Sequence, residues 1–423
     1  MRYFYTVVFY LLLPVILLRL WIKNRKKPAA LQHWHERLGL GLRPTPTQCI
    51  WLHAVSVGES IAAVPLIKQL KQGYPQIPIV VTGETIGGAE RIQAALGDQV
   101  HQLYAPYDVP CALKKFFQAL QPRLIILMET ELWPNLLAEA QQRNVPVVVA
   151  NARLSARSAL GYHRILSVTQ EMLSGLGQVI AQTQEDANRF IALGLPAERA
   201  HVTGSIKFDL ELPEQLAEKA QMLRALWGEE RWVWIAASTH EGEEEQIIEA
   251  FTQVRAKLGR RVLLVSVPRH VDRVPRLEAL YQRQGYQTLK RSDHQPCTVE
   301  TDVFLGDTMG ELLTFYAASD LAFVGGSLVE RGGQNPLEPA AVGVPILTGP
   351  HTFNFLLITE QLLARGGEIK IENAAQLAEN VIALLSDSAR RQEMGDKAKK
   401  FVVENKGAVL KHRQLLDKWL ETA

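Results

Sequence analysis

Cysteine is scarce in this sequence, which has only Cys49, Cys111 and Cys297 among its 423 residues. They lie too far apart for a CxxC metal or redox pair, and three are too few for a disulfide framework. This cysteine usage fits a reducing compartment. An excess of one charge is also lacking, because 46 Lys and Arg stand against 44 Asp and Glu. With no zinc-finger, RNP or basic-zipper pattern either, the sequence argues against a nucleic-acid partner.

Several signatures of well-known catalytic sites are absent too. There is no GxGxxG after a strand, no P-loop pattern, no GxSxG, no HExxH and no DxD pair. This removes the usual support for a dehydrogenase, a P-loop phosphotransferase, an α/β-hydrolase, a zincin and a metal-bridged nucleotide-sugar transferase. His240 in STHEGEEE matches no zinc-ligand spacing, and the acidic run after it fits a solvated helix start. We therefore expect neither a metal nor a cofactor.

The N-terminus carries the one long hydrophobic run. Tyr3 to Trp21 reads YFYTVVFYLLLPVILLRLW, about the 20 residues that a membrane-crossing helix needs, interrupted by Pro14 and Arg19. Only Arg2 precedes the run and KNRKK, Lys23 to Lys27, follows it, the reverse of a cleaved secretory signal. We interpret residues 1–22 as a retained membrane anchor that leaves the rest of the chain in the cytoplasm. The alternative is a buried core helix.

Short apolar runs alternate with helical patterns along the rest of the chain, as in βαβ units. A polar helical stretch without a strand follows Asp209, which puts a domain boundary around Lys207 to Glu214. We therefore expect an α/β protein with parallel-sheet domains at residues 23–209 and 210–423. The predicted strands are Ile50 to Val57, Ile77 to Thr82, Leu124 to Met128, Val145 to Ala150, Trp232 to Ala237, Arg261 to Val267, Asp320 to Val324 and Val344 to Leu347.

The two halves open with similar segments. WLHAVSVGES and WIAASTHEGE each read as a strand, a turn of small residues and a Gly-Glu at a helix start. This echo predicts a cleft between two Rossmann-like domains, with ligands at the carboxyl ends of the strands. The C-terminal segment, Asp396 to Leu420, reads as a helical packing element.

The best candidate for a phosphate site is Ala318 to Pro350. A strand runs into Gly325, Gly326 and Ser327, where glycine lets a ligand approach the backbone. Further along, Asn335 is a good N-cap, with Pro336 at N1, Leu337 at N2 and Glu338 at N3. Free N–H groups at such a helix start favour an anion. Glu338 serves either as a capping-box partner of Asn335 or in ribose binding.

Three acids follow strand ends in the first half. Glu59 lies in the first turn of the helix after Val57 and is either a charge favoured by the helix dipole or a general base. Its pKa would fall at a helix N-terminus unless burial offsets the dipole. Glu129 and Glu131 in METELWPN occupy the same sheet edge, as helix N-terminal charges or as part of a site.

Two cations are placed to face the predicted cleft. Lys207 lies in GSIKFD at the boundary, and Arg269 lies in VPRH after another predicted strand. A lone surface lysine is usually only solvated. Together with the helix start at Asn335, these two residues would hold a leaving phosphate without a metal.

Eight ordered blocks together resemble the 3-deoxy-D-manno-octulosonic acid (Kdo) transferase family of Gram-negative bacteria. The similarity runs from the anchor to about Pro350, and the blocks occur in the family's order. Beyond the anchor they are HAVSVGES, METELWPN, NARLSARS, GSIKFD, VPRH, GDTMGEL and GGQNPLEPAA.

The resemblance implies a GT-B glycosyltransferase in the inner membrane. Such an enzyme moves Kdo from CMP-Kdo to the lipid A precursor lipid IVA, with inversion, no metal and no cofactor. By motif, Glu59 is the expected catalytic base, and Glu129, Glu131 and Lys207 assist it. The expected substrate-binding residues are Pro268, Arg269, Met309, Gly310, Glu311, Gly325, Gly326, Ser327, Asn335, Pro336, Leu337 and Glu338.

Two other functions are compatible with the sequence. A sugar-nucleotide epimerase, or a transferase with another donor, would share the helix start at Asn335 but has little reason for a membrane helix. A tethered, non-catalytic protein would bind nucleotides or lipid headgroups in the same cleft without turnover. Release of CMP from CMP-Kdo separates these readings from the Kdo transferase.

Overall fold

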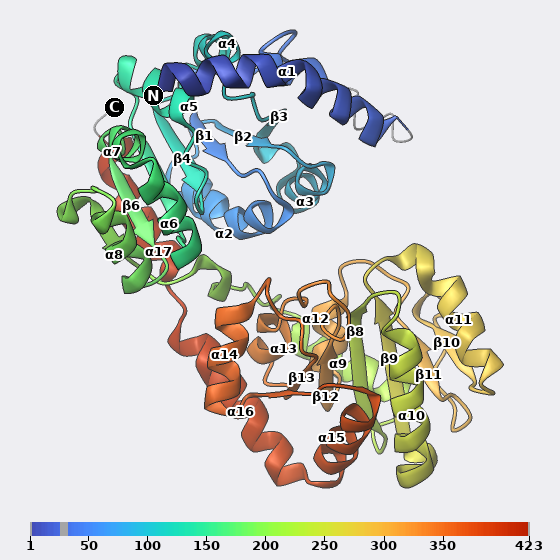
Figure 1. Cartoon of the computed structure of the whole chain (residues 1–423). Helices are drawn as coiled ribbons and strands as arrows, with labels where there is room; N and C mark the ends of the chain where they lie inside the picture. The colour runs from blue at the N-terminus through green and yellow to red at the C-terminus, as the bar shows by residue number, and fades with distance from the viewer. Residues whose placement is uncertain (1, 26–32, 422–423) are drawn as a thin grey trace. The chain divides into compact units, whose positions relative to one another are not determined.

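The chain folds into two compact units, which we describe one at a time (Figure 1). The structure is a computed structural model that describes residues 2–25 and 33–421. The first unit comprises Met1–Asp209 together with Lys406–Ala423, and the second comprises Leu210–Asn405. The chain thus leaves the first unit after Asp209 and returns to it at Lys406.

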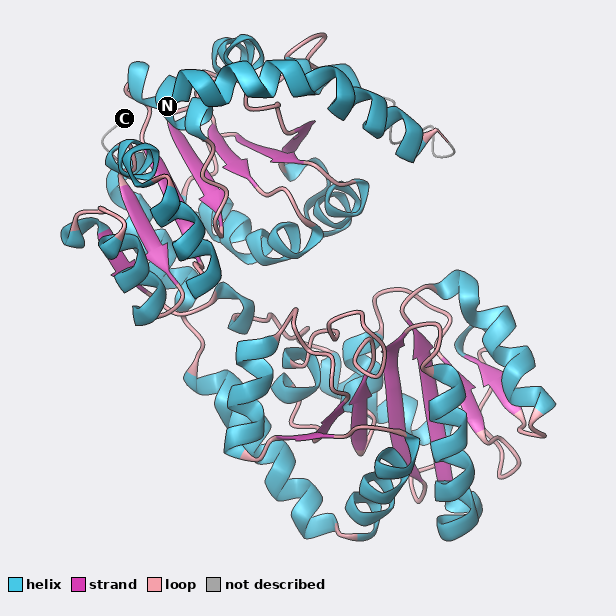
Figure 2. Ribbon diagram, viewed as in Figure 1, coloured by secondary structure: helices cyan, strands magenta, loops and turns pink. Residues whose placement is uncertain are grey.

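The first unit is built on a seven-stranded sheet in the order β3-β2-β1-β4-β5-β6-β7, with parallel pairing throughout. Its central strands β1, β4 and β5 are buried along their whole length because helices cover both faces of the sheet (Figure 2). The strands are β1 Ile50–His53, β2 Ile79–Gly83, β3 His101–Tyr104, β4 Leu124–Met128, β5 Val147–Ala152, β6 Gln178–Ala181 and β7 Ala200–Val202.

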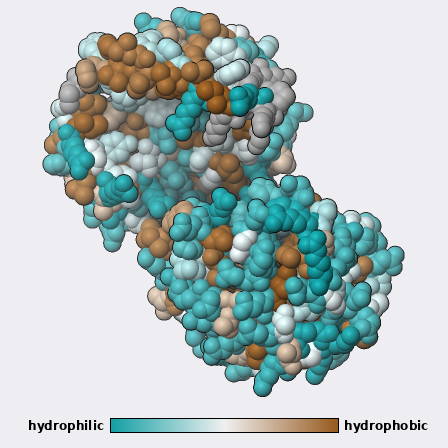
Figure 3. Space-filling view, turned by 45° about the vertical axis from the view of Figure 1, so that its right-hand side comes forward, coloured by the Kyte–Doolittle hydropathy of each residue, from teal (hydrophilic) through white to brown (hydrophobic). Residues whose placement is uncertain are grey.

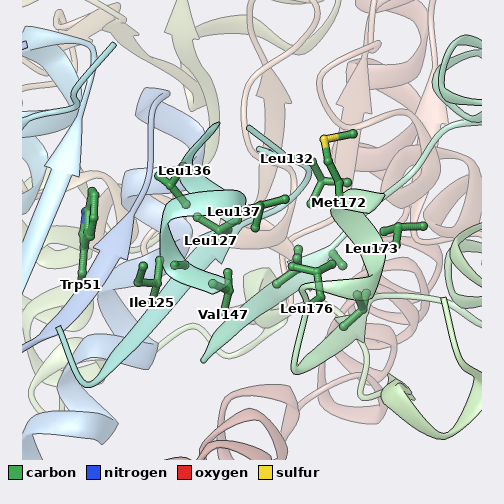
Figure 4. Close-up of a cluster of buried hydrophobic side chains, with 14 of the residues drawn as sticks. Trp51, Ile125, Leu127, Leu132, Leu136, Leu137, Val147, Met172, Leu173 and Leu176 are labelled. Atoms are coloured by element: carbon green, nitrogen blue, oxygen red, sulfur yellow. The ribbon is translucent and has the colours of Figure 1, made fainter. Parts of the chain in front are cut away.

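Two hydrophobic cores hold this unit together, one on each face of the sheet. Helices α4, α5, α7 and α8 pack on one face, where Trp51, Ile125 and Leu137 are buried (Figure 4). Helices α2, α3 and α17 cover the other face. The helices are α2 Val57–Gly73, α3 Ile86–Leu96, α4 Pro110–Leu120, α5 Pro134–Gln142, α6 Ala156–Arg164, α7 Leu166–Ser174, α8 Gln184–Ala192 and α17 Ala408–Leu420.

The C-terminal helix α17 belongs to the first unit, which corrects the predicted limits of the second domain. The prediction assigned all of residues 210–423 to the second half, whereas Lys406–Ala423 pack with the first. Ala408, Val409, Leu416 and Leu420 of α17 are buried in the core beside α2. A pattern of helical apolar spacing shows that a helix has a buried face, but not which sheet covers it.

The second unit repeats the architecture with strand order β10-β11-β9-β8-β12-β13-β14, again parallel. Cores lie on both faces, with α10, α11 and α15 on one and α9 and α12 on the other. The strands are β8 Trp232–Thr239, β9 Val262–Pro268, β10 Thr288–Lys290, β11 Val303–Leu305, β12 Leu321–Val324, β13 Ile346–Thr348 and β14 Glu368–Lys370. The helices are α9 Leu216–Trp227, α10 Glu244–Leu258, α11 Val274–Arg283, α12 Leu312–Ala317, α13 Leu337–Ala341, α14 Leu356–Arg365, α15 Ala374–Ser386 and α16 Ser388–Glu404.

The predicted α/β class with parallel-sheet domains is confirmed. Each of the eight predicted strands corresponds to a strand: Leu124 to Met128 matches β4 at both ends, and the other seven differ at one end or both. The strand predicted to reach Val57 ends at His53, because Ser56 caps a helix that already includes Val57.

The N-terminal hydrophobic run forms helix α1, Arg2–Asn24, with Pro14 inside it. Within the part of the chain that the structure describes, residues 2–22 form the one helix long and apolar enough to cross a membrane. Figure 3 shows hydrophobic surface gathered on the first unit where α1 lies. Lys26 and Lys27 of the predicted basic run lie outside the described residues.

Candidate functional site

Glu59 forms reciprocal hydrogen bonds with the N-cap residue Ser56 at the start of α2. Its backbone N–H donates to Ser56 Oγ at 3.2 Å, and Ser56 Oγ donates to Glu59 Oε1 at 2.8 Å. The second carboxylate oxygen, Oε2, accepts the Val55 N–H at 2.8 Å. The helix therefore starts here because a serine and a glutamate stand three residues apart. Glu59 thus has a structural role, since it fixes the start of α2 together with Ser56.

The same carboxyl has an unusual acidity. Glu59 is only 6% exposed. Burial raises its pKa to about 7, the nearby Glu131 and Glu129 carboxylates add to the rise, and the bonds from Ser56 and Val55 oppose it. Burial thus outweighs the hydrogen bonds from Ser56 and Val55. A carboxyl that titrates near neutrality can accept a proton at physiological pH, as a general base must.

Glu129 and Lys207 form an ion pair at the same sheet edge. Glu129 comes directly after β4 with φ 57°, and its N–H donates to Ala150 O on the neighbouring strand β5. Lys207 lies in the short 3-10 helix η5, Ile206–Phe208, and its Nζ is 2.9 Å from Glu129 Oε1. The two groups are about one-fifth exposed, so the pair is reachable from solvent.

Glu131 is held by Trp133, which lies two residues further along the same motif. Trp133 Nε1 donates to Glu131 Oε2 at 2.9 Å, and the Trp133 ring meets the His53 ring edge-on at 4.4 Å between centroids. Burial raises the pKa of Glu131. His53 ends β1, is fully buried and bonds Thr82 Oγ1 at 2.8 Å. Burial lowers the pKa of His53 to about 3, so this ring is neutral.

A second buried histidine organises the segment that carries Lys207. Asn151 N–H donates to His412 Nε2 at 2.9 Å, and Asn151 Oδ1 accepts the Ile206 N–H at 3.1 Å. His412 Nδ1 lies 3.2 Å from Thr203 Oγ1 and 2.7 Å from Ala408 O. Burial lowers the pKa of His412 to about 4, consistent with a neutral ring that accepts at Nε2. No local sequence pattern predicts this contact, since 261 residues separate its partners.

In the second unit, the glycine-rich turn after β12 differs from the prediction. The N–H groups of Gly326, Ser327 and Leu328 donate to the Glu243 carboxylate at 2.7, 3.0 and 2.9 Å. Ser327 is fully buried and donates to Val324 O. A Cβ on Gly325 would lie 2.8 Å from backbone atoms of Ala237, Ser238 and Thr239 at the end of β8. The amides expected to meet a phosphate are therefore occupied by a side chain of the unit itself.

Glu243 also corrects the interpretation of STHEGEEE as a solvated helix start. Its carboxylate is fully buried and accepts a further bond from the His240 N–H at 2.8 Å. The adjacent Glu244 is buried as well and pairs with Arg273 at 2.7 Å. Part of this acidic run is thus internal, and it anchors α10 to the turn after β12.

Positive charge collects where β8 and β9 end. Arg269 follows Pro268, the last residue of β9, and its N–H donates to Thr239 O at the end of β8. His240 bonds Gln334 at 3.1 Å. The pKa of His240 is lowered to about 4, mainly by burial and in addition by the electrostatic effect of the surrounding basic side chains. These side chains are Arg331, His270, Arg269 and Arg273.

The predicted GDTMGEL residues lie in the loop after β11. Arg291 donates to the Glu311 carboxylate through Nη2 at 3.0 Å and through Nε at 3.2 Å, and Thr308 Oγ1 donates to the same group. Gly310 has φ 83°, which glycine adopts without strain. Met309 is 69% exposed.

The helix that follows Asn335 begins one residue later than predicted. Asn335 Oδ1 accepts the Leu337 N–H at 3.1 Å, and its Nδ2 donates to Glu338 Oε1 at 3.2 Å. Helix α13 begins at Leu337, after Pro336, and has five residues. Leu337 is fully buried, so its side chain offers no surface to a ligand. The Asn335–Glu338 contact resembles the capping alternative, although it joins the two side chains.

Among the residues described, no group of three or more His, Cys, Asp or Glu is arranged to hold a metal ion. At the carboxyl ends of its strands, each unit carries a different set of charged residues. Carboxylates and Lys207 lie on the first unit, and the arginine and histidine cluster lies on the second.

Comparison with known proteins assigns both units. The family described as 3-deoxy-D-manno-octulosonic-acid transferase (kdotransferase) matches residues 32–210, and glycosyl transferases group 1 match residues 233–401. A solved structure of a putative UDP-N-acetylglucosamine 2-epimerase from Listeria monocytogenes is 14% identical and has a TM-score of 0.55. It covers 90% of this chain and 98% of that one, which shows a shared fold alone.

These findings define a glycosyltransferase with two Rossmann-like domains of the GT-B type. The chain is 42% identical to the 3-deoxy-D-manno-octulosonic acid transferase of Haemophilus influenzae, over 99% of each chain. It is 37% identical to the enzyme of the same name from Bordetella pertussis, over 98% of this chain and 99% of that one. The chain belongs to the 3-deoxy-D-manno-octulosonic acid transferase family.

Proposed function

We propose that this protein transfers Kdo from CMP-Kdo to the lipid A precursor lipid IVA. The transfer is a direct displacement with inversion at the anomeric carbon, uses a carboxylate base and needs no metal. Relatives that match almost the whole chain carry the name of Kdo transferase, which supports the sugar. The observation that carries the mechanism is Glu59, a buried carboxyl whose pKa is raised to about 7 at the carboxyl end of β1.

The first unit supplies the base. Glu59 removes the proton from a sugar hydroxyl of the acceptor, and that oxygen attacks the anomeric carbon of Kdo as the bond to the CMP phosphate breaks. Lys207, held 2.9 Å from Glu129, places a positive charge at the same edge, where charge changes during the reaction. Glu131 keeps negative charge near Glu59, which helps to hold the pKa of the base up.

The second unit binds the donor. In this proposal Arg269 and its neighbouring cations at the ends of β8 and β9 stabilise the departing phosphate of CMP. Met309, Gly310, Glu311, Asn335 and Glu338 contact the nucleotide. Gly326 and Ser327 shape this region through their bonds to Glu243, and Gly325 through its close approach to the end of β8, rather than by binding phosphate themselves.

The acceptor fits a membrane-associated enzyme. Lipid IVA lies in a bilayer, and the exposed apolar surface of α1 would keep the first unit beside it. We propose the inner membrane as the location, with both units on the cytoplasmic face, because basic residues follow the helix.

Mass spectrometry of the lipid after incubation of the purified full-length chain with CMP-Kdo tests this proposal. The expected result is lipid IVA heavier by whole Kdo residues, with an equal amount of CMP released. The number of residues added is read from the same spectrum. CMP-Kdo that binds but stays intact would instead show a non-catalytic binding protein. A donor sugar altered without change to the lipid would indicate an epimerase.

A further inference from the structure

We propose that α1 is an in-plane anchor, which lies lengthwise on the first unit and enters only one leaflet of the bilayer. A helix of this composition at an N-terminus is usually taken to cross the membrane. The proposal rests on the membrane location proposed above and specifies how the chain meets the bilayer.

One face of α1 is docked on the protein. Its inward side chains pack against Tyr107, Val109 and Ala112, which lie just before and within the start of α4. The docked residues of α1 are Phe9, Leu13, Ile16 and Leu17. They recur at spacings of three and four, so they form one stripe of the helix.

Polar contacts fix the N-terminal part of the same helix. Thr6 Oγ1 donates to Asn135 Oδ1 at 2.9 Å, and Arg2 lies 3.9 Å from Glu171 of α7. Tyr10 OH accepts the N–H of Cys111 at 3.4 Å. Together with the apolar stripe, these contacts extend from the first turn to Leu17.

This docking is incompatible with crossing a bilayer. A helix of 23 residues is about 35 Å long, barely more than the hydrocarbon core of about 30 Å. Lipid would have to surround nearly its whole length, yet Arg2 to Leu17 contact the first unit. If α1 crossed the bilayer, Tyr107 and Val109 would lose the α1 side chains that pack against them, and the Thr6–Asn135 hydrogen bond would break.

The outer face of α1 is apolar too and needs a cover of its own. It exposes a second stripe, and the occupant that fits is lipid rather than another protein surface. Tyr3 and Trp21 lie near the two ends, where aromatic rings favour the interface, and Arg19 is exposed where it can reach anionic headgroups. The exposed stripe comprises Phe4, Val7, Leu11, Val15, Leu18 and Ile22.

The arrangement ties the anchor to the proposed active site. Asn135, which accepts from Thr6, stands in the first turn of α5 and follows Glu131 by four residues. Its N–H donates to Asp108 Oδ2 at 3.0 Å, so Thr6 and Asp108 both hold the start of α5 through Asn135. A helix immersed in the leaflet would therefore hold the Glu131 segment at the depth of the headgroups, where the acceptor's sugars lie.

The position of the N-terminus decides between the two arrangements. An epitope tag is placed before Met1 of the full-length chain, and protease is added to spheroplasts and, separately, to inverted inner-membrane vesicles. An in-plane helix keeps the tag on the side of the two folded units, so it is removed only in inverted vesicles. Removal in intact spheroplasts would show that α1 crosses, and would overturn the proposal while leaving the membrane location intact.

A binding experiment identifies what covers the outer stripe. Purified protein is mixed with vesicles of phosphatidylglycerol and phosphatidylcholine. The triple variant Leu11→Ser, Val15→Ser and Leu18→Ser is expected to bind them at least about tenfold more weakly. The control Met222→Ser, Val403→Ser and Leu410→Ser removes apolar groups of similar exposure elsewhere, 51–60% against 56–73%, and should bind as the wild type does.

Equal binding by both triple variants would overturn lipid as the occupant. A wild-type dimer in detergent-free buffer that only the α1 variant dissociates would point to a second copy instead. Neither readout depends on sugar transfer, so failure of the Kdo transferase proposal would appear separately in the mass spectrum of the lipid.

Discussion

Ser56 and Glu59 bond to each other in both directions, with Glu59 N–H donating to Ser56 Oγ and Ser56 Oγ donating to Glu59 Oε1. The residue proposed to act as base is thus also the residue that starts α2. Substitutions that separate these two roles are therefore needed, since loss of activity alone would fit either one.

The rate of transfer should rise with pH through about 7. Glu59 accepts a proton only when ionised, and burial holds its pKa there. Below that pH the rate is expected to fall about tenfold per unit, and above it the rate should level off. Ser56→Ala loses a bond to the ionised carboxylate, so the rise of the rate with pH should shift to higher pH. Initial rates of CMP release give the pH profile of the wild type and of the variant. The same profile in both would contradict the assignment to Glu59.

Lys207→Ala should lower the turnover number by about a hundredfold, because a charge near the reacting centre is removed. The free energy of unfolding should change by only about 1 kcal/mol, since the pair with Glu129 is partly exposed. Arg224, paired with Asp320 at 3.0 Å with the same exposed fractions, is the matched control. Arg224→Ala is expected to leave turnover unchanged. Equal losses in both variants would assign Lys207 a structural role.

His412→Ala should reduce both stability and turnover although it lies in the last helix. The change leaves the buried Asn151 N–H without its acceptor and opens a cavity. Together these effects should lower the free energy of unfolding by about 2–4 kcal/mol. Turnover should fall because Asn151 also positions Ile206, the residue before Lys207. The KM for CMP-Kdo should stay constant. His412→Gln, whose amide oxygen can accept the same bond, should recover part of the loss, and no recovery would argue against the contact.

Glu243→Ala should lower the free energy of unfolding of the second unit by about 3–5 kcal/mol, because four backbone N–H groups lose a buried acceptor. Glu243→Gln should cost less, since the amide oxygen still accepts. Chemical denaturation measures the stability and calorimetry measures CMP binding. If the alanine variant instead kept full stability and bound CMP more tightly, the amides of Gly326 and Ser327 would be a phosphate site after all.

Much of the fold was predictable from apolar runs. Strands such as Leu124–Met128 are buried on both faces and stand out in the sequence, whereas His101–Tyr104 and Thr288–Lys290 are short and partly exposed, so they do not. The docking of α1 was not predictable, because a helix that is apolar on every side gives no periodicity from which to tell its protein face from its lipid face.

The candidate site was predictable only in part. Glu59, Glu129 and Lys207 lie in turns that follow predicted strands or a boundary, where position alone marks them. Glu243 and His412 act through partners that lie 83 and 261 residues away, and no local pattern predicts such pairs. Gly326 shows the opposite error, since a glycine-rich turn looks the same whether its amides meet a ligand or an internal carboxylate.

The most direct test of the account is the rate at which Glu59→Gln releases CMP from CMP-Kdo with lipid IVA present. Glutamine keeps an acceptor for the capping bonds but cannot take a proton at this pH. We expect the rate to fall by about a thousandfold with CMP affinity unchanged, while Ser56→Ala, which loses the cap and keeps the carboxyl, stays within about tenfold of the wild type. Transfer by Glu59→Gln within tenfold of the wild-type rate would show that this carboxylate is not the base.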